Sequence, residues 1–419
     1  MLDINKIINH REEIEMALAK RMERATVTKI FDTVISLDEQ RRTLIKQVED
    51  LKAERNIHSK TKPTPEVIAQ MKKLGEQIKI LDEQLKTVEA QFTETLAALP
   101  NIPADDVPAG DKEANQVIKT WGKKPVFKFT PKDHMALATS LDIIDYERAA
   151  KMSGAGFWIY RGLGAELEWA LLNYFVDFHR SNGYMFIWPP YLLTEQSAYT
   201  SGHLPKFRDD LFWVQDGLCL DATSEMMLGN YHRDEILDEK LLPLKYYAYS
   251  ACFRREAGSY RKEERGMVRG HQFNKIEMFQ FTRPEDSPAA LEELTRSAEK
   301  LVEGLGLHYQ SVLLAAEDAS PAMHKTIDIE VWIPSMNVYK EVSSASSAID
   351  YQARRGNIRY KDSATGKNEF VHTLNASGLA TSRLVPAILE QFQQKDGSIK
   401  IPKVLQKYMG KVKVIKPKK

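Results

Sequence analysis

The sequence predicts an α+β protein in two parts: an N-terminal antiparallel coiled-coil hairpin, followed by a larger domain in which helices flank an antiparallel β-sheet. Three observations lead to this prediction: a heptad pattern early in the chain, a proline-rich break after it, and a series of short strand patterns with few helices between them. A chain of 419 residues is also long enough to form two or three domains with sizeable cores.

The composition is that of an ordinary folded protein, with 43% hydrophobic and 28% charged residues, and it excludes a disordered or membrane-embedded chain. Because the formal charge is only +1, a nucleic-acid partner would have to meet local basic patches. The only two cysteines, Cys219 and Cys252, suggest neither a disulfide framework nor a zinc site, because no histidine or cysteine lies near them at metal-ligand spacing. This fits a protein of a reducing compartment. The N-terminus does not resemble a signal sequence, and no run reaches the roughly 20 apolar residues of a membrane span. We therefore expect a cytoplasmic protein without a membrane partner.

Two heptad runs dominate the N-terminal part of the chain. Their apolar residues alternate at spacings of three and four, which is the pattern of a coiled-coil seam. The first run contains Ile30, Val34, Leu37, Leu44, Val48 and Leu51, and the second contains Val67, Met71, Leu74, Ile78, Leu81, Leu85, Val88 and Phe92. Because Pro63 and Pro65 lie in the short break between the runs, we expect antiparallel neighbouring helices of about 30 residues each. Residues 1–21, which precede the first run, are amphipathic and rich in charge and predict a further helix.

Basic side chains occupy the outer faces of the two predicted hairpin helices. They are Arg41, Arg42, Lys46, Lys52, Arg55, Lys60 and Lys62. Such cations attract phosphate groups, but Glu39, Glu49 and Glu54 lie among them. Taken alone, the pattern therefore favours an ordinary solvated face of a coiled coil.

A change of composition at residues 99–110 (LPNIPADDVPAG) marks the predicted domain boundary, because prolines and paired aspartates are typical of a linker. We assign residues 1–104 to the helical arm and 111–419 to the second domain. Strand patterns then follow in GFWIYRG, MFIWPP, KYYAYSACFRR, KIEMFQFTR and TIDIEVWIP, and helical patterns at 165–180 and 289–305. Strands that follow one another without a helix between each pair favour an antiparallel sheet.

The strongest candidate site lies where two strand patterns meet across a charged segment. Arg254 and Glu256 follow the first strand, and Phe273 and Glu277 belong to the second. A guanidinium group binds phosphate or carboxylate oxygens through two parallel hydrogen bonds, and a phenylalanine ring can stack on a purine. The segment between the strands contains Arg261, Lys262, Glu263, Glu264 and Arg265. This pattern predicts a nucleoside triphosphate site, with a charged surface hairpin as the alternative.

Two weaker patterns come later in the chain. Glu341 ends a strand pattern and precedes several serines, and carboxylates in such a setting hold Mg²⁺ against phosphate oxygens. Gly378 precedes a helix pattern that carries Arg383 in its first turns, and a helix N-terminus beside an arginine favours an anion. An ordinary loop and an ordinary helix start would explain these patterns nearly as well. GLGAEL at Gly162 lacks the third glycine of a dinucleotide-binding fingerprint and is set aside.

In this order, the three patterns resemble motifs 2 and 3 of the class II aminoacyl-tRNA synthetases and the ATP-binding strand between them. GYMFIWPP is similar to motif 1 of that class, which implies a homodimer. HLPKFRDDLF, ATSE, NYHRDEI, EVSS, QARRGNIRY and KYMG narrow the resemblance to the bacterial-type seryl-tRNA synthetases, over essentially the whole chain. The resemblance implies ATP-dependent activation of L-serine and its transfer to tRNA(Ser), and also to tRNA(Sec). The hairpin would be the arm that binds the long variable region of the tRNA, and DNA is not expected as a partner.

The resemblance also implies roles for individual residues. Arg254 would bridge the α-phosphate and the serine carboxylate, Phe273 would stack on adenine, and Arg383 would bind the γ-phosphate. The implied catalytic residues are Arg254, Glu341 and Arg383, and the implied ligands of Mg²⁺ are Glu341 and Ser344. The implied ATP contacts are Arg254, Arg255, Glu256, Phe273, Glu341, Val342, Ser343, Ser344 and Arg383. The implied serine contacts are Thr223, Glu225, Arg254, Glu277, Asn375 and Ser377.

The sequence departs from the family pattern close to several of these residues. Asp221, Ala222 and Ser224 replace Ile, Pro and Ala, Arg261 and Lys262 replace Gly and Arg, Gly270 replaces a longer side chain, and Ala345 and Ala376 replace Cys and Gly. These departures leave open a paralogue that adenylates serine, or a related small amino acid, for an acceptor other than tRNA. A non-catalytic coiled-coil RNA-binding protein is an alternative from another class. The hairpin argues against the first alternative, and five retained ligands of substrate and ATP argue against the second.

Overall fold

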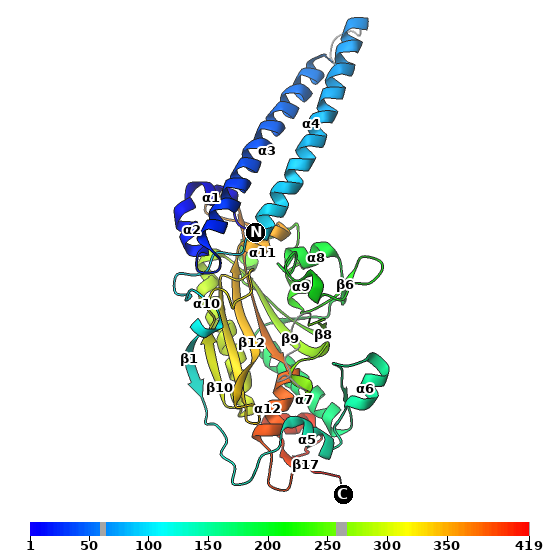
Figure 1. Cartoon of the computed structure of the whole chain (residues 1–419), viewed down its shortest axis with the longest axis vertical. Coiled ribbons are helices and arrows are strands. Elements are labelled where there is room, and N and C mark those ends of the chain that lie inside the picture. Colours follow the sequence, from blue (N-terminus) through cyan, green and yellow to red (C-terminus); the bar gives the residue numbers. More distant parts are fainter. Residues whose placement is uncertain (59–63, 257–265, 419) are drawn as a thin grey trace. The chain divides into compact units, whose positions relative to one another are not determined.

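The computed structural model describes residues 1–58, 64–256 and 266–418. Contacts within the chain divide it into two units, Met1–Ile102 and Pro103–Lys419, which are drawn in Figure 1. The division falls inside the proline-rich segment LPNIPADDVPAG. Two groups of residues considered above lie outside the described residues: Lys60 and Lys62 of the arm, and 261–265 of the charged segment.

The first unit is built on two long helices, α3 (Arg24–His58) and α4 (Pro65–Ala98) (Figure 1). They run antiparallel, because Lys52 pairs with Asp82 and Arg41 lies over the Phe92 ring. The Thr64 hydroxyl accepts the backbone N–H of Val67, and Pro65 fills the first turn of α4, where no amide hydrogen is needed. The most buried seam side chains are Val34, Leu37, Val48, Leu74 and Ile78. The predicted coiled-coil hairpin is confirmed.

The prediction of one helix over residues 1–21 is wrong, because the chain forms two short helices, α1 (Ile4–Asn9) and α2 (Arg11–Leu18). His10 interrupts them with a non-helical backbone, at φ −128° and ψ 36°. Both short helices contact α3, and Ile7 and Leu18 are completely buried. The break thus allows two short apolar faces to cover the same long helix, which one straight helix would not do.

An eight-stranded sheet forms the centre of the second unit, in the order β1-β10-β11-β12-β15-β9-β8-β4. In that order, the strands are Gln116–Trp121, Tyr309–Leu313, Lys325–Ile333, Val338–Ile349, His372–Ala380, Gln272–Thr282, Leu244–Phe253 and Met185–Ile187. All neighbours are antiparallel except the short pair β4 and β8. The predicted antiparallel sheet is therefore confirmed. The pattern GFWIYRG forms β3 (Ile159–Tyr160), which pairs with β2 (Ile144–Asp145) outside this sheet.

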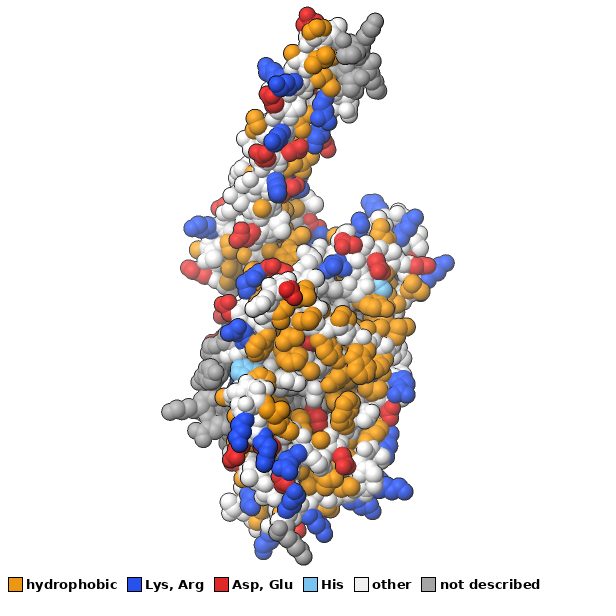
Figure 2. Space-filling view, turned by 90° about the vertical axis from the view of Figure 1, so that its right-hand side faces the viewer, with side chains coloured by type: hydrophobic (Ala, Val, Ile, Leu, Met, Phe, Trp, Pro, Cys, Tyr) orange, Lys and Arg blue, Asp and Glu red, His pale blue; other side chains and the backbone are white. Residues whose placement is uncertain are grey.

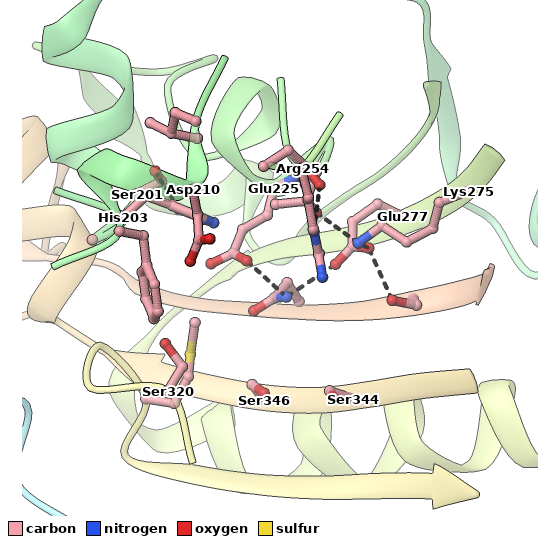
Figure 3. A pocket seen from close by; sticks show the side chains of 18 of the residues that line it. Ser201, His203, Asp210, Glu225, Arg254, Lys275, Glu277, Ser320, Ser344 and Ser346 are labelled. Atoms are coloured by element: carbon pink, nitrogen blue, oxygen red, sulfur yellow. Dashed lines mark hydrogen bonds and ion pairs between the residues drawn. The ribbon is translucent and has the colours of Figure 1, made fainter. Parts of the chain in front are cut away.

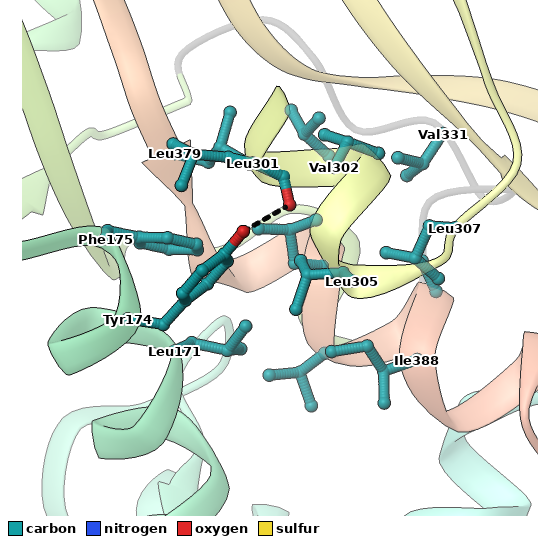
Figure 4. Packing of buried hydrophobic residues seen from close by; sticks show 14 of the residues in the cluster. Leu171, Tyr174, Phe175, Leu301, Val302, Leu305, Leu307, Val331, Leu379 and Ile388 are labelled. Atoms are coloured by element: carbon teal, nitrogen blue, oxygen red, sulfur yellow. Dashed lines mark hydrogen bonds between the residues drawn. The ribbon is translucent and has the colours of Figure 1, made fainter. Parts of the chain in front are cut away.

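Three helices pack together on the sheet and bury the largest core: α7 (Leu163–Ser181), α10 (Ser287–Leu305) and α12 (Thr381–Gln391). Figure 4 shows Phe175 of α7, Leu301 of α10 and Ile388 of α12 within this cluster. The Tyr174 hydroxyl, also buried there, donates a hydrogen bond to the Leu301 carbonyl at 3.3 Å. The helices predicted at 165–180 and 289–305 are confirmed as α7 and α10.

Shorter elements complete the second unit. Its other α-helices are α5 (His134–Ser140), α6 (Tyr146–Ser153), α8 (Glu195–Thr200), α9 (Glu225–Leu228) and α11 (Tyr351–Gly356). Its other strands are β5 (Leu192–Leu193), β6 (Cys219–Leu220), β7 (Ile236–Asp238), β13 (Arg359–Lys361), β14 (Asn368–Phe370), β16 (Ile399–Lys400) and β17 (Val414–Ile415). Among the described residues, no helix is both long enough and apolar enough to cross a bilayer.

Candidate functional site

A cavity of about 400 Å³ lies over the middle strands of the large sheet (Figure 3). The strand period places its lining: on β9, Lys275 and Glu277 line the cavity, whereas Ile276 and Met278, which alternate with them, belong to the hydrophobic core. The cavity therefore opens on the face of the sheet opposite the packed helices. A smaller neighbouring cavity, of about 40 Å³, is lined by Phe273 and shares several residues with the first.

A β-bulge on β12 decides which of its residues reach the cavity. Ser343 pairs with Ile329, but Glu341 pairs with Glu330, so Val342 is an extra residue between them. A bulge reverses the alternation of side chains along a strand. Glu341 and Ser344, which are an odd number of residues apart, consequently line the same cavity.

Four of the predicted serine contacts are brought together by hydrogen bonds around Glu277 (Figure 3). The Asn375 amide donates to Glu277 Oε1 at 2.9 Å and to Glu225 Oε2 at 3.3 Å. The Ser377 hydroxyl donates to Glu277 Oε2 at 3.3 Å. Because these side chains come from α9, β9 and β15, the fold joins residues that are up to about 150 positions apart in the sequence.

Two cations balance these carboxylates. Arg254 lines both cavities, and its Nε donates to the Ala222 carbonyl at 3.2 Å while its guanidinium lies 5.2 Å from the centre of the Phe273 ring. Lys275 Nζ donates to Thr223 Oγ1 at 2.6 Å and forms an ion pair with Glu277. All six predicted serine contacts therefore lie around one cavity.

Glu225 is a buried carboxylate with an unusual acidity. Burial and, to a lesser extent, the negative charge of Glu277 together raise the pKa of Glu225 to about 7. The Gln352 amide from α11 donates to Glu225 Oε1 at 2.7 Å. Near neutral pH the group is therefore poised between a neutral acid and a carboxylate.

A second group of predicted residues surrounds Glu341, which lines both cavities. Arg383 Nη1 donates at 2.8 Å both to the side chain and to the backbone carbonyl of Glu341. Burial opposes ionisation of Glu341, but the charge and hydrogen bond of Arg383, together with the charges of Arg254 and Lys275, outweigh burial and lower the pKa of Glu341. The Ser344 hydroxyl donates to Asp328 at 2.6 Å. Burial, together with the charge of Glu341, holds the pKa of Asp328 well above its usual range.

Three residues predicted to contact ATP do not line either of these cavities. Val342 is buried in the hydrophobic core, and the buried Ser343 hydroxyl donates to the Ser377 carbonyl at 2.6 Å. Arg255 is exposed, and its guanidinium lies 5.8 Å from the centre of the Phe212 ring. Glu256 does line both cavities, and it accepts a hydrogen bond from Arg269 at 2.6 Å.

Lys275 and Gln352 are among the residues of the site that the sequence analysis did not predict. Lys275 lies two positions before Glu277 on β9, so the strand period alone would have placed both on one face. Gln352 is the first residue of the motif QARRGNIRY, but that motif alone does not show that the side chain reaches Glu225 from α11.

Gly270, one of the departures from the family pattern, is explained by its surroundings. A Cβ atom there would overlap the Trp158 ring and lie 2.8 Å from the Gly156 carbonyl oxygen. We expect Gly270→Ala to lower the midpoint of thermal unfolding by several degrees, because neither the indole nor the backbone can yield cheaply. In a Trp158→Ala background, Gly270→Ala should lower the midpoint by less than it does beside the indole, whereas an unchanged midpoint in Gly270→Ala would contradict the explanation.

Comparisons with known families and proteins find similar sequences over nearly the whole chain. A family model described as the tRNA synthetase class II core domain (G, H, P, S and T) matches residues 207–392. A model described as the seryl-tRNA synthetase N-terminal domain matches residues 1–103. A protein of Clostridium acetobutylicum named serine–tRNA ligase 2 is 53% identical, over 99% of this chain and 100% of its own. The serine–tRNA ligase of Petrotoga mobilis is 47% identical, over 98% of this chain and 99% of its own.

Solved structures are similar over the full chain. The crystal structure of seryl-tRNA synthetase from Pyrococcus horikoshii complexed with ATP has a TM-score of 0.91 at 36% identity and covers 100% of both chains. The cytoplasmic serine–tRNA ligase from Naegleria fowleri in complex with AMP has a TM-score of 0.86 at 30% identity and covers 100% of this chain and 99% of its own.

Proposed function

Because the chain belongs to the seryl-tRNA synthetases of class II, we propose that the cavity activates L-serine with ATP and transfers the seryl group to the 3′ end of tRNA(Ser). The observation that carries the proposal is the hydrogen-bonded group of Glu225, Glu277, Asn375 and Ser377 beside Arg254. It offers acceptors for an ammonium and a hydroxyl next to a guanidinium that suits a carboxylate.

Serine fits this group through each of its polar atoms. Its ammonium pairs with Glu225 and the Thr223 hydroxyl, its side-chain hydroxyl donates to Glu277, and its carboxylate accepts hydrogen bonds from Arg254. Glu277 is only 1% exposed, so it would lose a hydrogen bond if alanine took the place of serine. A site built to bind a hydroxyl rejects an analogue that lacks it by up to about 10⁴ to 10⁵.

ATP extends from this group into the smaller cavity. Phe273 stacks on the adenine, and Arg254 lies between that ring and the serine group, where it meets the α-phosphate. Arg383 binds the γ-phosphate, in exchange for one of its two bonds to Glu341. Arg255, Glu256, Val342 and Ser343 remain proposed contacts, of which Val342 and Ser343 offer mainly backbone atoms.

The residues around Glu341 fit a bound Mg²⁺ ion. Glu341 and Ser344 present hard oxygen donors, and Asp328 beside them has a raised pKa because it is buried and because the negative charge of Glu341 lies close to it. No cluster of three or more metal-binding side chains occurs among the described residues. This matches Mg²⁺, which usually takes one or two carboxylates and completes its shell with phosphate oxygens and water. When bound, the ion supplies positive charge that neutralises phosphate oxygens.

The reaction proceeds in two steps. In the first, the serine carboxylate oxygen attacks the α-phosphorus in line, the bond to the β-phosphate oxygen breaks, and pyrophosphate leaves. Arg254 and Arg383 stabilise the negative charge on the phosphate oxygens. In the second, a terminal ribose hydroxyl of the tRNA attacks the seryl carbonyl and AMP leaves. We assign no general base, because positioning of the two reactants accounts for much of such a rate.

Serine binding should depend on pH through Glu225. With a pKa of about 7, its charged fraction rises roughly tenfold between pH 6 and pH 8. Because only the carboxylate pairs with the serine ammonium, KM for serine in pyrophosphate exchange is expected to fall by up to about tenfold over this range.

Variants of two acidic residues identify the group responsible for this dependence. Glu225→Gln should remove it. Burial also raises the pKa of Asp221 to about 7, so Asp221→Asn serves as the matched control and should retain it. A KM for serine that is constant from pH 6 to pH 8 would contradict the assignment.

The helical arm, residues 1–104, is the proposed tRNA-binding domain, and residues 111–419 are the catalytic domain. Arg41 and Arg42 form ion pairs with the buried Asp38 of the same helix. Part of their positive charge is therefore already neutralised within α3. Lys46 and Arg55 present further positive charge to a phosphate backbone. The same arm would bind the long variable region of tRNA(Sec), which we propose as a second acceptor in the cytoplasm.

A homodimer is also part of the proposal. Figure 2 shows hydrophobic side chains gathered over one face of the second unit. In and near the motif 1 segment, Met185, Phe186 and Trp188 are 59%, 41% and 67% exposed, and patches of this kind mark protein interfaces. A molar mass of one chain in light scattering would contradict the dimer.

The test of the proposed function is pyrophosphate exchange with each of the twenty amino acids and ATP. Exchange is expected with serine, and only weakly or not at all with alanine, threonine and glycine. Exchange driven by another amino acid would favour the paralogue, and a complete lack of exchange would favour a non-catalytic RNA-binding protein.

A further inference from the structure

Lys275 is a buried cation inside the proposed serine pocket. It is 5% exposed, its Nζ donates to Thr223 Oγ1 at 2.6 Å, and it forms an ion pair with Glu277 (Figure 3). We assign its partner Thr223 to the ammonium of serine and its partner Glu277 to the hydroxyl of serine. The ligand therefore enters a pocket that already contains a positive charge.

The Glu277 carboxylate has few hydrogen-bond acceptor sites left for a ligand. It accepts hydrogen bonds from Asn375 and Ser377 and pairs with Lys275. An ionised carboxylate offers about four lone-pair sites, so three donors leave room for about one more. A buried charge is stable only when it is paired, and Lys275 fulfils this role for Glu277.

The charges of the pocket then match those of serine. At pH 8, where Glu225 is mostly ionised, the two negative charges of Glu225 and Glu277 and the positive charge of Lys275 leave one negative charge, which the single ammonium of serine neutralises. The partners of Glu225, namely Gln352 and Asn375, are neutral amides. Arg254 remains for the serine carboxylate and the phosphate.

We propose that Lys275 makes the pocket selective for an uncharged side chain, because it compensates Glu277 and repels an ammonium group placed where serine has its hydroxyl. The excluded class is that of small diamino acids, such as L-2,3-diaminopropionate, whose side-chain amino group replaces the hydroxyl. Like charges at contact distance in a buried site strongly disfavour each other. The inference rests on the proposed function, since it assumes that Glu277 receives the hydroxyl of serine.

The test compares kcat/KM for serine and for L-2,3-diaminopropionate in pyrophosphate exchange at pH 8. Lys275→Met should raise the ratio of diaminopropionate to serine by about tenfold or more, because Glu277 then lacks its internal cation. Lys275→Gln, which can keep a hydrogen bond to Thr223 without the charge, carries the same expectation. Lys275→Arg retains the charge and should keep the wild-type ratio.

A double variant distinguishes the effect of the Lys275 charge from a general loss of pocket structure. Lys275→Met combined with Glu277→Gln removes both charges, so activity on serine should fall without a gain for diaminopropionate. Thermal unfolding shows which variants are folded. Equal losses for both substrates in folded Lys275→Met and Lys275→Gln would overturn the inference, as would the same gain in the double variant. A wild-type chain that gives no exchange with serine would instead overturn the proposed function.

Discussion

Replacing Arg254 with alanine is expected to lower kcat/KM for serine-dependent pyrophosphate exchange by about 10³ or more. Arg254 lines both cavities and is held in place by its bond to the Ala222 carbonyl. It meets the serine carboxylate and the α-phosphate together, and arginines that stabilise charge in phosphoryl transfer contribute about 10³ to 10⁵ in rate. The loss should appear mainly in kcat, because the interaction strengthens as charge develops.

Two further variants make this prediction specific. Arg254→Lys keeps the charge but loses the planar fork, so most of the loss should remain. Arg148→Ala removes an exposed arginine of α6 that pairs with Asp145, and exchange should stay at the wild-type rate. Exchange within tenfold of wild type in folded Arg254→Ala would show that this residue does not bridge the two substrates.

Shortening the arm is expected to separate the two steps of the reaction. We would remove residues 45–86 and join the ends with a short glycine linker, which keeps the base of the hairpin, where Ile7, Phe31 and Val34 are completely buried. Pyrophosphate exchange should stay within about threefold of wild type, because the second unit has its own core. Charging of tRNA(Ser) should fall by about 10² or more in kcat/KM for tRNA, since the phosphate contacts of the arm are lost.

Both activities should be measured on the same preparation. Retained exchange then serves as the control for correct folding of the second unit. Charging that stays within tenfold of wild type would mean that the arm does not bind the tRNA.

The fold could be predicted largely from the sequence, because the spacing of apolar residues distinguishes coiled-coil helices from strands. The seam from Val34 to Val48 predicts a coiled coil, and successive strand patterns predict the antiparallel sheet. The break at His10 could not be predicted, because the amphipathic pattern continues across it and only the packing on α3 requires two helices.

Site residues could be predicted where they belong to local sequence motifs. They could not be predicted where the fold changes which side chains of a strand share a face. Glu277 and Arg254 stand in recognisable patterns, and the structure brings them to one cavity. The bulge at Val342 depends on the pairing of β12 with β11, so the strand period alone would have placed Glu341 and Ser344 on opposite faces, and only the family resemblance implied that they act together. Gly270 could not be understood before Trp158, which lies more than a hundred positions earlier, was placed against it.

The measurement that tests the central claim most directly is charging of purified tRNA(Ser) with labelled serine by the full chain. We expect serine to accumulate on the 3′ end of the tRNA in a reaction that requires ATP and is competed by unlabelled serine. Serine-dependent exchange in the same preparation without any charged tRNA(Ser) would contradict the account, because the seryl-adenylate would then be made for a different acceptor.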